Sequence, residues 1–314
     1  MAKKLASLML FVTLTLALLS PGAGAQQVAD SSFAPPIPSP AYAPGRGPAV
    51  LLDEAHFNFH TADGRYLPFA ELLRRDGYVV RASTSRFSRA SLRRGKILVI
   101  ANALAERNQT DWSLPTPSAF SDEEIAAVCE WVKGGGSLLL IADHMPFAGA
   151  AEKLARALGI QFSNGYAVDE SGPRPMVFRR SDGSLRGSLV TGGRTDAERV
   201  DSVASFTGSA FQAERDVEPL LVLGPSVVSV MTSVAGQVSD ETPRTPAGGW
   251  YQGAIMRFGK GRVAVFGEAA MFSAQLGGPD RIPMGMNAPI AAQNPQFLLN
   301  VMHWLSGKLR DTKS

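Results

Sequence analysis

The sequence predicts an α/β fold: a mostly parallel sheet between two layers of helices, with an antiparallel extension. From residue 49 onward, short apolar runs typical of buried strands alternate with helical patterns, and the connections between them are short. Later in the chain, residues 251–258 and 262–267 flank a Gly-Lys-Gly turn, which is typical of an antiparallel hairpin. The chain has one cysteine, so its core must form without an internal disulfide, as a domain of about 260 residues can.

Each element of the first half has its own local signal. The expected strands cover residues 49–53, 78–82, 96–101 and 137–142. The expected helices cover residues 68–76, 88–94, 121–133 and 148–158. Ser121 and Glu124 form a capping box that starts the third of these helices. Between residues 163 and 250 the pattern is irregular, and a last helix over 294–305 carries apolar residues at helical spacing.

The first 25 residues have the pattern of a secretory signal peptide. Lys3 and Lys4 precede an apolar run over residues 5–19, and Ala-Gly-Ala at 23–25 suits a cleavage site. We therefore expect export to the periplasm or beyond, with no stable membrane span after cleavage; a retained N-terminal anchor is the alternative. Residues 26–48 are rich in proline and are expected to form an extended linker, and residues 307–314 a tail.

The charge balance argues against nucleic acid as a partner. Removal of the signal peptide takes away two lysines and no acid, which leaves 29 basic against 28 acidic residues. No basic stripe interleaved with aromatic residues is present. A ligand, if the protein binds one, is therefore expected to be a small molecule, a sugar or a peptide.

Three of the four histidines follow predicted strands. His56 and His60 come after the strand at 49–53, which ends at Asp53, and His144 comes after the strand at 137–142. Open α/β sheets bind ligands beyond the carboxyl ends of their strands. Imidazoles and carboxylates are ligands of divalent metals such as zinc, so these four residues form the predicted metal site. The alternative is that the histidines lie in separate loops and share no site.

Two further carboxylates are the predicted catalytic groups. Asp143 lies between a strand and a helix, and Glu268 follows the strand at 262–267. Beside a metal-bound water, whose pKa falls to about 7, either carboxylate suits the role of general base. The alternatives are that Asp143 caps the following helix and that Glu268 forms a surface ion pair. The residues expected to line the same pocket are Glu54, Asn58 and Asn102.

Two stretches, residues 134–160 and residues 265–305, resemble the class I glutamine amidotransferase-like fold, a flavodoxin-like arrangement. The similarity is to a poorly characterised branch, some members of which are linked with ABC-transport and gliding-motility accessory proteins. The resemblance implies one domain over residues 49–306, loosely matched between 163 and 250. It also implies a cysteine at the strand-to-helix turn, with a histidine and a glutamate after a later strand. Here Asp143 and His144 occupy that turn, and Glu268 has no adjacent histidine.

Amidotransferase activity is therefore not expected, and two kinds of function stay open. The first is an exported, metal-assisted hydrolase, which the predicted convergence of histidines favours. The second is a non-catalytic ligand-binding or transport-accessory domain. Cys129 lies at an apolar position of the helix at 121–133, where a buried side chain is expected rather than a nucleophile.

Overall fold

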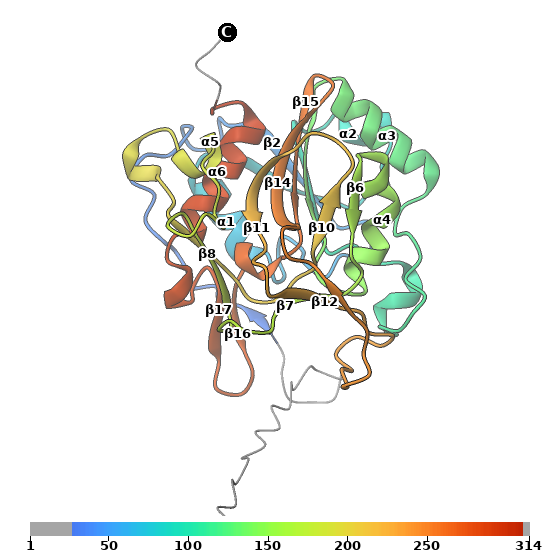
Figure 1. Ribbon diagram of the computed structural model, residues 1–314. Coiled ribbons are helices and arrows are strands. Elements are labelled where there is room, and N and C mark those ends of the chain that lie inside the picture. Colours follow the sequence, from blue (N-terminus) through green and yellow to red (C-terminus); the bar gives the residue numbers. More distant parts are fainter. Residues whose placement is uncertain (1–26, 310–314) are drawn as a thin grey trace, which may run out of the picture.

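The computed structural model describes residues 27–309, so the expected signal peptide lies outside the described residues. A nine-stranded sheet forms the centre, in the order β3-β2-β4-β5-β15-β14-β10-β6, with β11 also paired to β14 (Figure 1). Its strands are β2 (Ala49–Asp53), β3 (Val79–Ser83), β4 (Ile97–Ala101), β5 (Ser137–Ile141), β6 (Ile160–Phe162), β10 (Phe211–Ala213), β11 (Glu218–Val222), β14 (Tyr251–Phe258) and β15 (Gly261–Phe266).

The sheet is mixed. β3, β2, β4, β5 and β15 are parallel neighbours, whereas β14 runs antiparallel to β15 and extends the sheet through β10, β11 and β6. This confirms a mixed α/β fold with a large sheet, including the hairpin expected at 251–267. The chain adds β3 on one side of β2 and then crosses back to add β4 on the other, so the strand order reverses between β2 and β4.

Helices cover both faces of the sheet. Figure 1 shows α2, α3 and α4 on one side and α1, α5 and α6 on the other. The helices are α1 (Leu67–Arg75), α2 (Arg89–Leu92), α3 (Asp122–Lys133), α4 (Phe147–Ala157), α5 (Leu189–Gly192) and α6 (Asn294–Ser306), with short 3-10 turns η1 (Glu106–Gln109), η2 (Asp196–Glu198), η3 (Ala270–Phe272) and η4 (Pro289–Ala291).

Strand side chains divide the core into two parts. Successive side chains of a strand point to opposite faces. Val50 and Leu52 accordingly pack in the cluster that includes α1 and α6, whereas Leu51 packs in the cluster that includes α3 and α4. Both faces of the parallel strands are buried, which explains their almost continuous apolar sequences.

The irregular second half, together with residues 28–29, forms three small sheets. Their strands are β1 (Val28–Ala29), β16 (Ala274–Gly277) and β17 (Ile282–Gly285) in the first, β7 (Tyr166–Asp169), β12 (Val227–Val230) and β13 (Arg244–Pro246) in the second, and β8 (Met176–Arg179) and β9 (Ser202–Ser205) in the third. Most of these strands have two to four residues, too few for a periodic sequence signal. Within residues 27–309, no helix is both long and apolar enough to cross a membrane.

The segment before β2 differs from the expected free linker. Val28 and Ala29 pair with β16, and Tyr42 packs edge-on against Tyr78 with ring centroids 5.2 Å apart. Ala41 donates its backbone N–H to the buried carboxylate of Asp76 at 2.7 Å. The segment lies against the domain, where Phe33, Ile37 and Tyr42 pack on the core.

Candidate functional site

Four of the predicted site residues lie at one edge of the sheet. Asp53 ends β2, Asn102 directly follows β4, and Asp143 and Glu268 each come two residues after β5 and β15. The Asp143 backbone N–H donates to Asn102 Oδ1 at 2.9 Å, and one Asp143 carboxylate oxygen accepts from the Ala269 N–H at 3.3 Å. Side chains therefore tie the ends of β4, β5 and β15 together.

His56 is clamped between two carboxylates. Its Nδ1 lies 2.9 Å from an Asp53 oxygen, and its Nε2 lies 2.9 Å from Glu124 Oε1 on α3. The ring packs against Phe87 and Phe120, at centroid distances of 4.5 and 4.8 Å, and is 1% exposed. Both ring nitrogens are thus engaged, so a metal ion at His56 would have to displace one carboxylate.

Electrostatics reinforce this clamp. Burial lowers the pKa of His56, but the hydrogen bonds and charges of Asp53 and Glu124 outweigh burial and raise it above its ordinary value. Burial raises the pKa of Glu124, but hydrogen bonds from the Ser121 N–H and His56 outweigh burial and lower it. The imidazole and Glu124 therefore favour each other's charged forms, and Arg86 also donates to Glu124 at 3.2 Å.

The polar residues around His56 hold the loop that follows β2. The Asn58 side chain donates to Asp53 at 3.0 Å and accepts the His56 backbone N–H at 3.1 Å. The Glu54 carboxylate accepts the Ala62 N–H at 2.7 Å. Asn58 and Glu54 thus fix the shape of the loop; neither lines the pocket next to it.

Phe57, at the tip of this loop, has a backbone conformation that is unfavourable for its residue type. Its φ is +48°, and its side chain is 41% exposed. A bulky L-residue rarely adopts a positive φ, and such conformations cluster at binding and catalytic sites. The neighbouring residues pin it there, because Leu104 N–H donates to the His56 carbonyl and Phe59 N–H to the Asn102 carbonyl, both at 2.9 Å.

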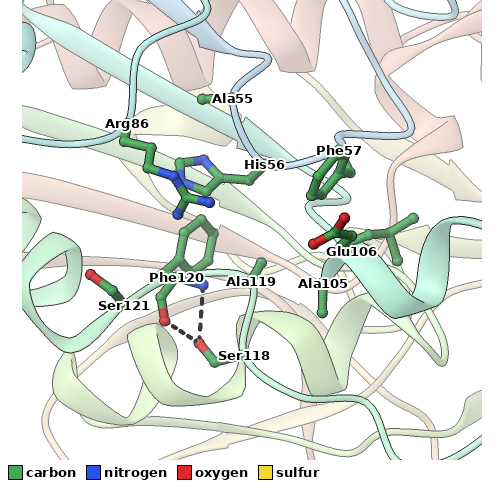
Figure 2. Close-up of a pocket in the computed structure, with 11 residues that line it drawn as sticks. Ala55, His56, Phe57, Arg86, Ala105, Glu106, Ser118, Ala119, Phe120 and Ser121 are labelled. Atoms are coloured by element: carbon green, nitrogen blue, oxygen red, sulfur yellow. Dashed lines mark hydrogen bonds between the residues drawn. The ribbon is translucent and has the colours of Figure 1, made fainter.

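A pocket of about 280 Å³ opens beside His56 (Figure 2). It lies between the loop after β2, the segment after β4, Arg86 after β3, and the residues that lead into α3. In the view of Figure 2, Arg86 lies beside the His56 ring, and Phe57 and Glu106 lie on the other side of the pocket. The pocket therefore sits at the strand-order reversal, where open α/β sheets bind their ligands.

His60 lies apart from His56. It is 3% exposed, its ring is 4.4 Å from that of Tyr66, and neither ring nitrogen has a hydrogen-bond partner within the described part of the chain. Burial, with a smaller effect from Arg65, lowers the pKa of His60 to about 3. His60 is therefore neutral at physiological pH.

Glu268 is completely buried and accepts hydrogen bonds from the backbone N–H groups of Ala270 and Met271, at 2.8 and 2.7 Å. Burial and the nearby Asp143 carboxylate raise its pKa well above the ordinary range. Asp143 is itself 5% exposed. These two carboxylates hold the loop after β15, and they line neither the pocket beside His56 nor the one along α3.

His144 packs against Phe147 and Tyr166. Its Nδ1–H donates to the Met145 carbonyl at 2.7 Å, and its ring stacks on Tyr166 at a centroid distance of 4.3 Å. The Nε2 atom is 3.9 Å from Asp143 Oδ1, too far for a hydrogen bond.

The predicted metal site is thus divided. The structure joins Asp53 with His56 but gives His60 and His144 separate surroundings. Among residues 27–309, no three His, Cys, Asp or Glu side chains are arranged to hold a metal ion. Zinc binding by these residues stays a prediction.

Sequence reasoning missed three residues of the site. Glu124 was assigned only a capping role, and its second contact with His56 spans 68 positions of sequence. Arg86 and Glu106 carry no motif and reach the pocket only because the ends of β3 and β4 flank β2. The order of the parallel strands, with β3 and β4 on either side of β2, is the signal that could have placed Arg86 and Glu106 beside His56.

The fold places the protein among α/β proteins with a large central sheet of mostly parallel strands. The chain matches no known protein family, and no curated protein is similar to it in sequence. Among solved structures, the N-terminal domain of mmIFT52 is similar, with 13% identity, a TM-score of 0.57 and coverage of 82% of this chain and 97% of that one. At this identity the likeness shows the fold alone.

The similar structures also include ThuA-like proteins. One from Bacteroides uniformis has 15% identity and a TM-score of 0.47, over 86% of this chain and 95% of that chain. Another, from Parabacteroides merdae, has 11% identity and a TM-score of 0.45, over 86% and 93%. These lower scores carry no argument about site or activity.

Proposed function

We propose that this protein is a ligand-binding domain that takes one small polar molecule in the pocket beside His56. One observation supports this proposal above the others. The pocket at the strand-order reversal is lined by Phe57, an exposed aromatic residue with a strained backbone. Strain of this kind persists only where the surrounding structure enforces it. Here the enforcing contacts are the His56 clamp and the two backbone hydrogen bonds to the segment after β4.

The environment of His56 favours binding over catalysis. A general base must reach the proton that it removes. His56 is almost wholly buried, and both of its nitrogens face carboxylates. We propose that His56 holds the wall of the pocket rigid. The pocket, at about 280 Å³, suits a molecule of about the size of a monosaccharide and not an extended peptide, since drug-sized ligands fill pockets of about 300–1,000 Å³.

We also propose that the domain has a three-layer fold of the class I glutamine amidotransferase-like kind. Helices on both faces and the parallel order β3-β2-β4-β5-β15 support a three-layer, flavodoxin-like arrangement of the class I glutamine amidotransferase-like kind. Glutamine hydrolysis is not part of it, because Cys129 lies on α3 and Asp143 and His144 occupy the turn after β5. Export follows from the sequence of residues 1–25 and is proposed on that ground alone.

Thermal unfolding of the purified protein with a panel of small sugars, amines and carboxylates tests the proposal. A ligand at 100 times its Kd should stabilise the native state by about 2.7 kcal/mol. Ala119→Trp fills the pocket and should abolish that gain. Ala90→Trp, at an exposed position of α2, is the matched control and should retain it. Equal stabilisation of both variants would place binding elsewhere and overturn the proposal.

A further inference from the structure

The charges around the pocket are unevenly compensated. His56 contacts Asp53 at 2.9 Å, and Arg86 contacts Glu124 at 3.2 Å, so both carboxylates behind the pocket wall have partners. Glu106 is exposed, lines the pocket, and has no ion pair with any residue in the range 27–309. Its neighbour Arg107 pairs instead with Asp111 at 2.9 Å. Glu106 therefore offers the pocket a carboxylate that no neighbouring cation of the described residues holds.

An aromatic face accompanies this free carboxylate. Figure 2 shows the Phe57 ring and the Glu106 carboxylate on the same side of the pocket. Phe57 is 41% exposed, and the conformation that exposes it is strained. A ring face attracts a cation through its quadrupole, and this attraction adds to that of a nearby carboxylate.

We propose that the ligand carries a positively charged ammonium group, bound between Phe57 and Glu106. The inference rests on the proposed ligand-binding function and specifies the chemical class of the ligand. Arg86 is unsuited to anchor an anion, because its charge is already shared with Glu124.

The size of the pocket limits the ligand to a small amine. At about 280 Å³ it accommodates a quaternary ammonium head with a short polar tail. The hydroxyl groups of Ser118 and Ser121 line the opposite wall, although each already takes part in a local hydrogen bond. A polar tail therefore has hydroxyl oxygens within the lining, and the ammonium group has the aromatic and acidic side.

Choline and its neutral isostere, 3,3-dimethylbutan-1-ol, separate charge from shape. Calorimetric titration at low ionic strength should show at least fivefold tighter binding of choline by the full-length mature protein, as expected where a cation meets both an aromatic face and a carboxylate. Glu106→Gln should remove this preference. Phe57→Leu should weaken choline about threefold and leave the neutral alcohol unchanged. Glu71→Gln, an exposed carboxylate on α1, is the matched control and should change nothing.

Some outcomes would contradict only the ammonium ligand, and others would also contradict the pocket as a binding site. Equal binding of choline and the alcohol, tighter binding of acetate, or an unchanged preference in Glu106→Gln would overturn the ammonium ligand and leave the pocket as a binding site. Choline, the alcohol, acetate and glucose would each be titrated against the parent and Ala119→Trp. If none of them binds to the parent at a site that Ala119→Trp blocks, both the ammonium ligand and the binding pocket are overturned. Phe57 and Glu106 are exposed, so their variants should fold like the parent.

Discussion

Individual residues of the site have environments that set opposite pH dependences. The carboxylates of Asp53 and Glu124 raise the pKa of buried His56, whereas burial lowers the pKa of His60 to about 3. A buried charge is tolerated when it is paired, and removal of one partner exposes the full cost of burying the others. Two histidines in one short loop therefore affect stability in different ways.

The contacts of His56 with Asp53 and Glu124 should add most to the free energy of unfolding in mildly acidic solution. The raised pKa of His56 adds stability that is complete below its ordinary value of 6.5 and is lost as pH rises through the folded value. The lowered pKa of Glu124 adds stability that is complete above 4.5 and is lost as pH falls through the folded value. The two contributions overlap between about pH 4.5 and 6.5.

His56→Phe should destabilise the protein by about 3–5 kcal/mol, because the ring still packs but two carboxylates lose their cation. Urea unfolding at pH 5.5 and at pH 9 measures the loss, which should be larger at pH 5.5. His144→Phe is the control, since His144 stacks on Tyr166 and its Nε2 is 3.9 Å from the Asp143 carboxylate, beyond hydrogen-bond distance. A cost under 1 kcal/mol at pH 5.5 would show that His56 is not an ionic clamp.

His60 should have the opposite effect. Its folded pKa of about 3 lies below the ordinary 6.5, so the unfolded chain binds the proton first and stability is lost as pH falls below 6.5. His60→Leu removes this loss and should be more stable than the parent by about 2 kcal/mol at pH 5, since each pKa unit is worth about 1.4 kcal/mol. A variant whose advantage does not grow between pH 7 and pH 5 would contradict the burial of a neutral imidazole.

At the scale of elements, the N-terminal segment joins two helices. Asp76, which follows α1, accepts the Ala41 N–H on one carboxylate oxygen and lies 2.7 Å from His303 Nε2 of α6 on the other. Both Asp76 and His303 are fully buried. The segment therefore completes a polar contact inside the core, in addition to its packing through Phe33, Ile37 and Tyr42.

Removal of this segment should destabilise the whole domain. A chain that starts at residue 46 loses the Ala41 hydrogen bond to a buried carboxylate, which costs about 1–3 kcal/mol, together with several partly buried side chains. Compared with a chain that starts at Gln27, its free energy of unfolding should fall by on the order of 3 kcal/mol or more. Equal denaturation midpoints for the two chains would mean that residues 27–45 form a free linker after all.

The accuracy of the sequence predictions also varied by element. Ser121 and Glu124 form the expected capping box, and α3 begins at the next residue. Strands of five buried residues, such as β4 and β5, were predicted because their side chains are apolar on both faces. β16 and β17 were not, because four-residue strands on the rim of the fold are stabilised by pairing rather than by a sequence pattern.

At the scale of the whole molecule, the sequence predicted which residues share one edge of the sheet but not the contacts that they make. Asp53, Asn102, Asp143 and Glu268 lie at one edge because parallel strands bring their carboxyl ends together. Which of them face a pocket depends on strand order and on contacts between distant residues. The contact from His56 to Glu124 joins the loop after β2 to α3, and no local pattern contains it.

A nuclear magnetic resonance titration tests most directly whether the pocket at the strand-order reversal is the binding site. Choline added to the ¹⁵N-labelled protein should shift the backbone amide signals of Phe57, Ala105 and Ala119 in a saturable manner. The amides of His144 and Tyr166, which stack outside the pocket lining, should stay in place. Saturable shifts at His144 and Tyr166 without any at Phe57, Ala105 and Ala119 would contradict binding in the pocket beside His56.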